Sequence, residues 1–272
     1  RLATNQRQRT EVGRAVAAAL HDRDLDTAWE HLKADGAVMV ARSREHKLEL
    51  VASTVAREIA AHGAEAVTCD AVPNAEVDDL NDRIHGRLLA SGILDRRAAV
   101  TFRTPSGERV LAPGTVLRVR TPRGDRNPER WLVRGDRAVV VHPGRDQVTI
   151  RLDDGSERTL SPRVLMRHLD YGYAGTTHKV QGQTSEVHIA SLAPTKDAAS
   201  LYVSASRARE RTLFVADARD YLSDREMRAT RQWDPQHLDD EVLDRVHRVL
   251  TGRVERLDSP HAALQPTWDP LS

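Results

Sequence analysis

The sequence is short of several residue types, and each shortage narrows the class of protein. A single cysteine, Cys69, in 272 residues excludes an internal disulfide and is typical of a reducing compartment. No apolar run reaches the roughly 18 residues of a membrane span, and no secretory signal opens the chain. The scattered histidines offer no ligand spacing typical of zinc. We therefore expect a cytoplasmic protein that does not contact the membrane and needs no structural metal.

Lysine is also scarce, because only four of the 41 Lys and Arg residues are lysines. Arginine forks suit phosphates and carboxylates better than lysine does, but a genome rich in G and C produces the same bias. The net charge of +1 argues against a general nucleic-acid coating protein. The phosphate-cradling pattern GxxxxGK[ST] is missing, as is an initiator methionine, so we interpret the chain as a piece of a longer protein.

Residues 1–100 alternate short apolar runs with amphipathic helical patterns. We expect strands at 37–40 and 67–72, and helices at 44–62 and 75–91. The order strand, helix, strand, helix predicts right-handed βαβ units and an α/β fold with a parallel sheet.

Residues 101–165 have a different character, with β-branched runs broken by turn residues such as the Asp-Gly pair in 153–155. The alternation at 116–119, 138–142 and 147–152 predicts half-buried strands. Such short strands favour a small SH3-like β-barrel inserted into the α/β domain. The α/β pattern resumes at 166–222 with strands expected at 187–192 and 212–215, and 223–272 is expected to be a helical, partly loose tail.

Three segments carry the most chemical information. Residues 173–184 read YAGTTHKVQGQT, and residues 202–209 read YVSASRAR, with Arg207 and Arg209 expected on the first turns of a helix. Near the start, residues 2–8 read LATNQRQ. Hydroxyls and an imidazole on a loop grip a sugar-phosphate backbone without reading bases. A guanidinium fork beside a transferring phosphoryl group is worth roughly 10³–10⁵ in rate.

Together these segments resemble motifs of superfamily 1 DNA helicases, in the branch that holds the RecD-like and TraA/TrwC conjugative enzymes. The resemblance covers about residues 1–220 and implies the second, C-terminal RecA-like (P-loop NTPase-type) motor domain, formed by 1–100 and 166–222. It implies contacts with single-stranded DNA at Thr176, His178 and Lys179. It assigns Gln181 and Gly182 to the seam where the two motor domains close on nucleotide.

For the other two segments the resemblance implies contacts with nucleotide. Arg207 matches the arginine finger, and Arg209 matches a residue that more often forms a supporting salt bridge. Arg7 matches an arginine that reaches the γ-phosphate, and Gln8 belongs to the same nucleotide-coupling element. Ser206 stands where Thr is usual, which keeps the hydroxyl.

A fainter match is residues 72–81, VPNAEVDDLN, where relatives carry Thr-Asn and a second Asn seven residues on. Pro73 replaces the usual Thr and removes a hydroxyl and a backbone donor. Asn74 is a candidate DNA contact, although helix capping alone explains it, and Asn81 is open to the same two interpretations.

The predicted barrel also offers a basic hairpin. Its arginines are Arg118, Arg120, Arg123, Arg126 and Arg130. They can lie along a nucleic-acid backbone, or pair locally with Asp125 and Glu129. Trp131 can stack on a base or complete a barrel core.

The resemblance implies ATP-driven translocation on single-stranded DNA in an intact protein that uses ATP and Mg²⁺. Walker A and B motifs are missing here, so we expect no ATP hydrolysis without the N-terminal motor domain. Partnership with conjugative transfer machinery, or an upstream relaxase, is an association only. Two alternatives stay open: a degenerate helicase domain that binds nucleic acid or protein, and an RNA helicase of the same superfamily.

Overall fold

The computed structural model describes residues 8–71, 74–104, 107–120, 133, 135–176, 185–193, 198–230 and 235–252. The chain forms two compact units, the first from residues 1–51 and 181–272 and the second from residues 52–180. The division falls within α3 (Arg44–His62), a helix whose bounds agree with those predicted from its periodicity. No helix among the residues described here is long and apolar enough to cross a membrane.

The first unit contains a parallel sheet, as predicted. Its strands are β1 (Val38–Ala41), β11 (Ser185–Ser191) and β12 (Ala208–Asp217). Strand β12 lies between the other two, with Val38 opposite Phe214 and Ile189 opposite Leu213. The run from Thr212 to Asp217 is buried throughout, which is typical of a parallel strand covered on both faces.

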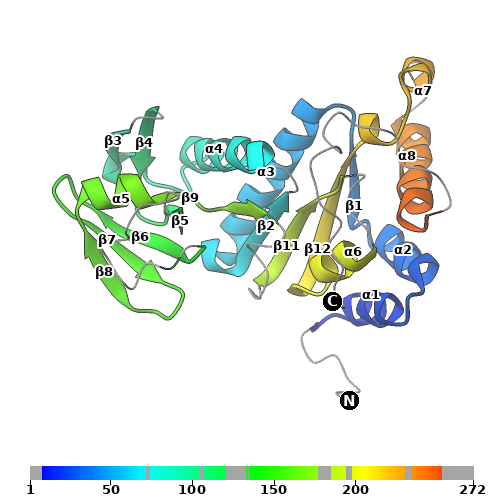
Figure 1. Cartoon of the computed structure of the whole chain (residues 1–272), viewed down its shortest axis with the longest axis horizontal. Helices are drawn as coiled ribbons and strands as arrows, with labels where there is room; N and C mark the ends of the chain where they lie inside the picture. The colour runs from blue at the N-terminus through cyan, green and yellow to red at the C-terminus, as the bar shows by residue number, and fades with distance from the viewer. Residues whose placement is uncertain are drawn as a thin grey trace. The chain divides into compact units, whose positions relative to one another are not determined.

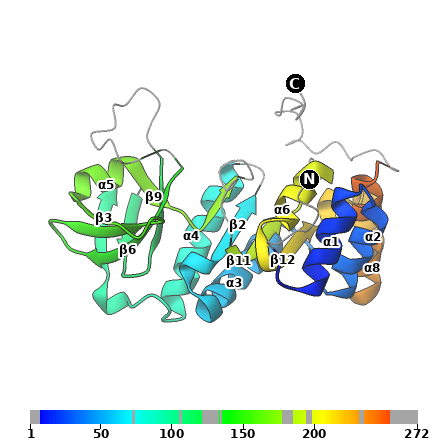
Figure 2. The ribbon, with the colours of Figure 1, turned by 90° about the horizontal axis from the view of Figure 1, so that it is seen from below.

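Helices surround this sheet in the first unit. They are α1 (Glu11–His21), α2 (Leu25–Ala34), α6 (Ala198–Ala205), α7 (Asp224–Ala229) and α8 (Pro235–Leu250), with a 3₁₀ turn η3 (Ala218–Asp220). Helices α1, α2 and α8 lie side by side (Figures 1 and 2). Helix α8 buries Leu238, Val242 and Val246, spaced four residues apart on one face, so this part of the predicted tail is packed.

The second unit begins with an α/β portion. It contains the 3₁₀ turn η1 (Ala64–Ala66), β2 (Val67–Ala71), α4 (Asn74–Ala90) and β10 (Ala174–Thr176). Strands β2 and β10 are parallel, with Ala174 opposite Cys69 and Thr176 opposite Ala71. Every residue of β2 is buried, including the polar Thr68 and Asp70.

The rest of the second unit is antiparallel. Its elements are η2 (Arg96–Ala98), β3 (Val100–Thr104), β4 (Gly107–Leu111), β5 (Val116–Val119), β6 (Arg137–Pro143), β7 (Val148–Leu152), β8 (Glu157–Leu160), α5 (Pro162–His168) and β9 (Leu169–Tyr171). Strands β3 and β4 form a hairpin, and the others form a sheet in the order β8-β7-β6-β5-β9. We call residues 100–171 the small β domain; its closure into a barrel stays a prediction.

The small β domain leads directly into β10 through Gly172 and Tyr173. A Cβ at Gly172 would lie 2.6 Å from the main-chain carbon of Leu117, so only glycine allows the two backbones to approach so closely. The path from the antiparallel sheet to the parallel pair is therefore two residues long and tightly packed.

Candidate functional site

The residues that precede α1 lie along the start of β12, although about 200 positions separate them in the sequence. The main-chain N–H of Arg9 donates to the carbonyl of Arg209 at 2.6 Å. The Thr10 hydroxyl donates to the carbonyl of Glu210 at 2.8 Å and also caps α1 by accepting from the N–H of Gly13. The fold therefore brings together the end of the 2–8 segment and the 202–209 segment.

The side chain of Gln8 holds the main chain on both sides of Arg207. Its Nε2 donates to the carbonyl of Ser206 at 3.0 Å and to that of Ala208 at 3.4 Å. The Gln8 side chain is buried, and its Oε1 has no hydrogen-bond partner among the residues that the structure describes. A buried acceptor without a donor is unusual, and it marks this place as a polar site.

Arg207 lies in the turn between α6 and β12, and its N–H donates to the carbonyl of Ser204 at 3.2 Å. The expectation that Arg207 and Arg209 occupy the first turns of a helix is wrong, because α6 ends at Ala205 and Arg209 belongs to β12. The buried apolar run that follows Arg209 favours a strand of the parallel sheet. Arg207 is only 3% exposed, so its guanidinium is buried.

Arg209 and Arg9 share one carboxylate, that of Glu186 on β11. The Nη1 atoms of both arginines lie 3.0 Å from Glu186 oxygens. Arg209 thus forms an ion pair of the kind that the resemblance implied, and its coupling to nucleotide stays a prediction. Because the side chains of Arg9 and Arg209 are 60% and 44% exposed, these ion pairs face solvent.

In the second unit, two of the predicted DNA contacts follow neighbouring strands. Thr176 is the last residue of β10 and pairs with Ala71, the last residue of β2. Helix α4 begins soon after β2, at Asn74, of which the structure describes the backbone only. Ligands of open α/β sheets bind outside the carboxyl ends of strands, and Thr176 and Asn74 both lie at this end.

Asn81 has a well-defined structural environment. Its Nδ2 donates to the carbonyl of Ala174 at 3.2 Å, and its Oδ1 accepts from the N–H of Ala174 at 2.9 Å. Both the amide donor and the amide acceptor are thereby engaged with the main chain of β10. Of the two interpretations left open for Asn81, the structure supports contact within the protein.

Several predicted residues lie outside the described residues, and their roles stay predictions. For the motif segments these are Arg7, His178, Lys179, Gln181 and Gly182. For the predicted basic hairpin they are Arg123, Asp125, Arg126, Glu129, Arg130 and Trp131.

The remaining arginines of the predicted hairpin, Arg118 and Arg120, do not form an open basic surface. Arg118 is only 4% exposed, and its Nη1 donates to the carbonyl of Gly135 at 3.0 Å. Burial, together with the nearby charge of Arg137, lowers the pKa of Arg118 to about 10. The prediction is wrong for these two side chains, because alternation along a strand does not show which arginines turn inward.

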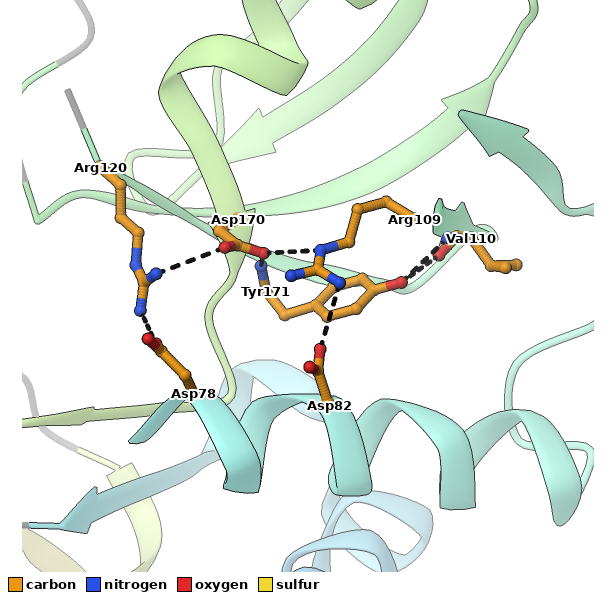
Figure 3. A network of polar contacts seen from close by, with 7 residues as sticks. All are labelled: Asp78, Asp82, Arg109, Val110, Arg120, Asp170 and Tyr171. Carbon is orange, nitrogen blue, oxygen red and sulfur yellow. Dashed lines mark hydrogen bonds and ion pairs between the residues drawn. The ribbon is translucent and has the colours of Figure 1, made fainter. Parts of the chain in front are cut away.

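Arg120 belongs instead to an arginine–aspartate cluster between the small β domain and α4, formed by Asp78, Asp82, Arg109, Arg120 and Asp170 (Figure 3). Arg120 bridges Asp78 of α4 and Asp170 of β9, the latter at 3.3 Å. Arg109 bridges Asp170 at 3.1 Å and Asp82 of α4 at 3.5 Å. The central Asp170 therefore receives both guanidinium groups.

An aromatic stack continues this contact into the interior. The hydroxyl of Tyr171 donates to the carbonyl of Val110 and accepts from its N–H, both at 3.0 Å (Figure 3). Arg109 lies over one ring, with its Cζ 5.1 Å from the centroid of Tyr171, and His85 of α4 stacks against Tyr171 at 4.0 Å. The Nδ1 of His85 lies 3.1 Å from the Tyr173 hydroxyl.

The titratable groups of this stack are neutral at pH 7. Burial lowers the pKa of His85 to about 4. Burial also raises the pKa of Tyr171 to about 12 and moves the pKa of Tyr173 further in the same direction. The stack is therefore a packing and hydrogen-bonding unit, and it offers no proton donor or acceptor for acid–base chemistry near neutral pH.

Sequence reasoning missed Glu186, Asp170 and the aromatic stack. One pattern pointed to them: Asp78, Asp82 and His85 are spaced four and three residues apart, which places them on one face of α4. Tyr173 begins the 173–184 segment, and Tyr171 precedes it by two residues. The partners of these residues come from strands distant in sequence, so the pattern alone does not identify them.

The chemistry open to the first unit follows from its donors. The guanidinium of Arg207 is suited to bind a phosphate once exposed, and the amide of Gln8 orients the main chain beside it. No group of three or more His, Cys, Asp or Glu side chains placed to hold a metal ion occurs within the described part of the chain.

Comparison with known proteins gives few matches in sequence. No family model matches the chain. Two curated proteins of Mycobacterium tuberculosis, both called uncharacterized (Rv2311 of strain H37Rv and MT2373 of strain CDC 1551), are 35% identical to it over 86 residues. That match covers 31% of this chain and 47% of each relative, so it spans about half the length of the relatives.

Among solved structures the chain is similar to Pif1 helicases. For a Bacteroides Pif1 helicase in complex with ADP-AlF3 and ssDNA, the TM-score is 0.45 at 15% identity, covering 76% of this chain and 49% of that one. For Bacteroides Pif1 bound to ssDNA the TM-score is 0.46 at 14% identity, with 81% and 51% covered. For the Candida albicans Pif1 helicase it is 0.37 at 15% identity, with 62% and 52% covered.

Proposed function

We propose that this chain is the C-terminal motor half of an ATP-dependent DNA helicase of superfamily 1, in the RecD-like/TraA/TrwC branch. In this proposal Arg207, assisted by Arg7, contacts the γ-phosphate of ATP that is bound mainly by a separate N-terminal motor domain. The contacts with single-stranded DNA come from Thr176, His178, Lys179 and Asn74. The coupling of nucleotide binding to DNA binding involves Gln8, Gln181, Gly182 and Arg209.

One observation carries the proposal: the Gln8 amide bonds to the carbonyls on both sides of Arg207. Two segments that resemble helicase motifs, about 200 residues apart, thus meet at a single residue. A guanidinium acts on a transferring phosphoryl group only if its backbone is held in place, since misplacement by about 1 Å costs about 10²-fold in rate. Gln8 supplies that restraint through its hydrogen bonds to the carbonyls of Ser206 and Ala208.

ATP fits this site on one condition. The cationic group is present, but Arg207 is only 3% exposed, so the side chain must become accessible when nucleotide binds. When bound, ATP would supply the free energy of phosphoryl transfer, with Mg²⁺ held by carboxylates of the other motor domain. Gln8 and Arg207 would hold and orient the terminal phosphate from this side.

The DNA-binding half of the proposal is supported by the shared edge of β2 and β10. Thr176 and Asn74 follow neighbouring parallel strands at their carboxyl ends, and both side chains bear groups that bond to phosphate oxygens. Hydroxyl and amide contacts of this kind position a strand without reading its bases. Binding independent of base sequence is therefore expected.

The test uses the purified chain and fluorescently labelled single-stranded oligonucleotides of mixed sequence. Fluorescence anisotropy at a stated salt concentration should show binding that weakens with salt, and Thr176→Ala should weaken it further. Thr149→Ala is the matched control, because that threonine is half-buried on β7 and its hydroxyl lies 3.3 Å from the Thr159 hydroxyl. Absence of binding, or equal effects of both variants, refutes the DNA contact; competition with RNA of the same sequence decides between DNA and RNA.

The nucleotide half is tested by activity. The chain alone should not turn over ATP, whereas a protein that joins it to a P-loop motor domain should, and Arg207→Ala should reduce that turnover by about 10³-fold or more. ATP turnover by the chain alone that disappears in Arg207→Ala would contradict this assignment. The coding sequence upstream of Arg1 is the quickest check, since the proposal expects a P-loop there.

The burial of Arg207 favours one second candidate, a degenerate helicase domain that only binds nucleic acid or a protein. In that case the guanidinium is a structural group, and Arg207→Ala lowers the stability of the fold with no effect on any nucleotide. The two candidates differ in whether residue 207 contacts the nucleotide when a P-loop domain is also present. Protection of an Arg207→Cys thiol by nucleotide would exclude the purely structural role.

A further inference from the structure

The contact between α4 and β10 has an unusual form. Strand β10 pairs with β2 along one edge. On Ala174, the N–H and the carbonyl both bond to the side-chain amide of Asn81, at 2.9 and 3.2 Å. A primary amide presents a donor and an acceptor side by side, as a neighbouring strand would. Asn81 therefore takes the place of a strand partner for the main chain of β10.

This amide lies at the point from which the predicted DNA loop departs. Ala174 is two residues before Thr176, and the loop 177–184 follows directly. Asn81 is buried, so its two bonds are shielded from competing water. The residue also belongs to the helix that begins at Asn74, so one rigid helix carries a predicted DNA contact and the restraint on another.

The residues before Ala174 are held just as firmly. Tyr173 is bonded through its hydroxyl to His85, also on α4, and Tyr171 is clamped to both main-chain groups of Val110 (Figure 3). The arginine–aspartate cluster adds further contacts from α4 to β9. The strand that leads to the loop is thus fixed from Tyr171 to Ala174, and Asn81 makes the last of these contacts.

We propose that Asn81 is a positioning residue for nucleic-acid binding, which fixes the main chain of β10 so that Thr176 meets the phosphate backbone. The inference rests on the proposed function and names a residue that touches no DNA itself. Its removal should leave the Ala174 N–H and carbonyl unbonded, and the start of the loop free to move.

The test compares Asn81→Ala with Ser161→Ala, a control that removes the hydroxyl bonded to the Val164 N–H at the start of α5 in the same unit. Hydrogen exchange at the Ala174 amide, measured by NMR, should be at least about tenfold faster in Asn81→Ala, with the amides of β5 and β6 unchanged. Affinity for a mixed-sequence single-stranded oligonucleotide should fall about tenfold by anisotropy. Ser161→Ala should change neither quantity.

Asn81→Asp provides a rescue that a general loss of stability would not show. A protonated carboxyl has one O–H donor and one acceptor oxygen, so it reproduces both bonds to Ala174. The ionised form lacks the donor, and burial opposes its charge. Slow exchange at Ala174, corrected for the intrinsic rate, should therefore return as the pH is lowered, and this readout is available if Asn81→Ala does not fold.

The outcomes separate this inference from the function on which it rests. Unchanged exchange at Ala174 in both Asn81 variants overturns the positioning role. Faster exchange with unaltered oligonucleotide affinity also overturns it, while the proposed function stands. A wild-type chain that does not bind single-stranded DNA overturns the proposed function, and the inference with it.

Discussion

Arginines in the two units have different partners, and the comparison shows how to interpret a buried guanidinium. In the first unit Arg9 and Arg209 share the carboxylate of Glu186 near solvent. In the second unit Arg137 is buried against main-chain carbonyls of Ala64, Glu65 and Val67.

Arg207 and Arg137 are both under 9% exposed, so burial alone does not assign a role to either arginine. Their neighbours do distinguish them. Arg137 joins β6 to η1 and the start of β2, whereas the carbonyls on both sides of Arg207 accept from the amide of Gln8. Variants that change these neighbours one at a time can break or sharpen the contrast.

The largest effect is expected from Arg137→Ala. The change leaves the carbonyls of Ala64 and Val67 without this donor and opens a cavity in the second unit, so it should lower the free energy of unfolding by about 3 kcal/mol or more. Urea unfolding measures this. Arg151→Ala is the control, because Arg151 is 43% exposed and pairs with Glu157 at 3.4 Å, and it should cost under about 0.5 kcal/mol. Equal losses of unfolding free energy in the two variants would show that burial of the arginine does not determine the cost of the substitution.

The next largest loss of stability is expected on acidification, because His85 is protonated in the unfolded chain before it is protonated in the fold. Its pKa falls from 6.5 in the unfolded chain to about 4 in the fold, because the buried ring disfavours the charged form. The unfolded state therefore binds more protons between these values, and stability is lost as the pH falls through this window.

Between pH 7 and pH 5 this amounts to about 2 kcal/mol. Urea unfolding at both pH values measures it, and His85→Gln should reduce the loss. His142→Gln, at an exposed histidine on β6, is a control that should leave the loss in place. A loss unaffected by His85→Gln would contradict the assignment.

A smaller effect is expected from Arg109→Gln. The change removes one guanidinium from the arginine–aspartate cluster and from the Tyr171 ring, and should cost about 1–2 kcal/mol, less at high salt because these groups are partly exposed. Thermal unfolding in low and high salt measures this. Arg103→Gln on the neighbouring strand is the control, since its pair with Glu108 is 3.8 Å long and its side chain is 92% exposed. Absence of any salt dependence would show that packing alone holds the contact.

The smallest effect should follow Arg9→Gln in the first unit. Its side chain is 60% exposed, so the pair with Glu186 should contribute under about 0.5 kcal/mol. Urea unfolding should barely separate this variant from the wild type. A loss as large as that of Arg109→Gln would remove the contrast between the two units.

Local pattern predicted much of the fold. The bounds of α3 and β5 agree with those expected, because an amphipathic stripe and a short alternating run are properties of neighbouring residues. The turn at Arg207 was predicted less well. A helix was expected to contain Arg207 and Arg209, whereas the pairing of β12 with β11 and β1 draws these residues toward the strand. The pairing of strands in the folded protein therefore overrides the helical propensity expected for this segment.

The candidate site, like the fold, was predicted from the sequence only in part. The resemblance of three sequence segments to helicase motifs singled out Arg207, Gln8 and Thr176, since a motif is a spacing of residue types along the chain. Contact with Gln8, the burial of Arg207 and the bonds from Asn81 to Ala174 appear only in the folded protein. These partners are about 90 to 200 residues apart in the chain, and only the packing of strands and helices decides which polar groups are left to find each other.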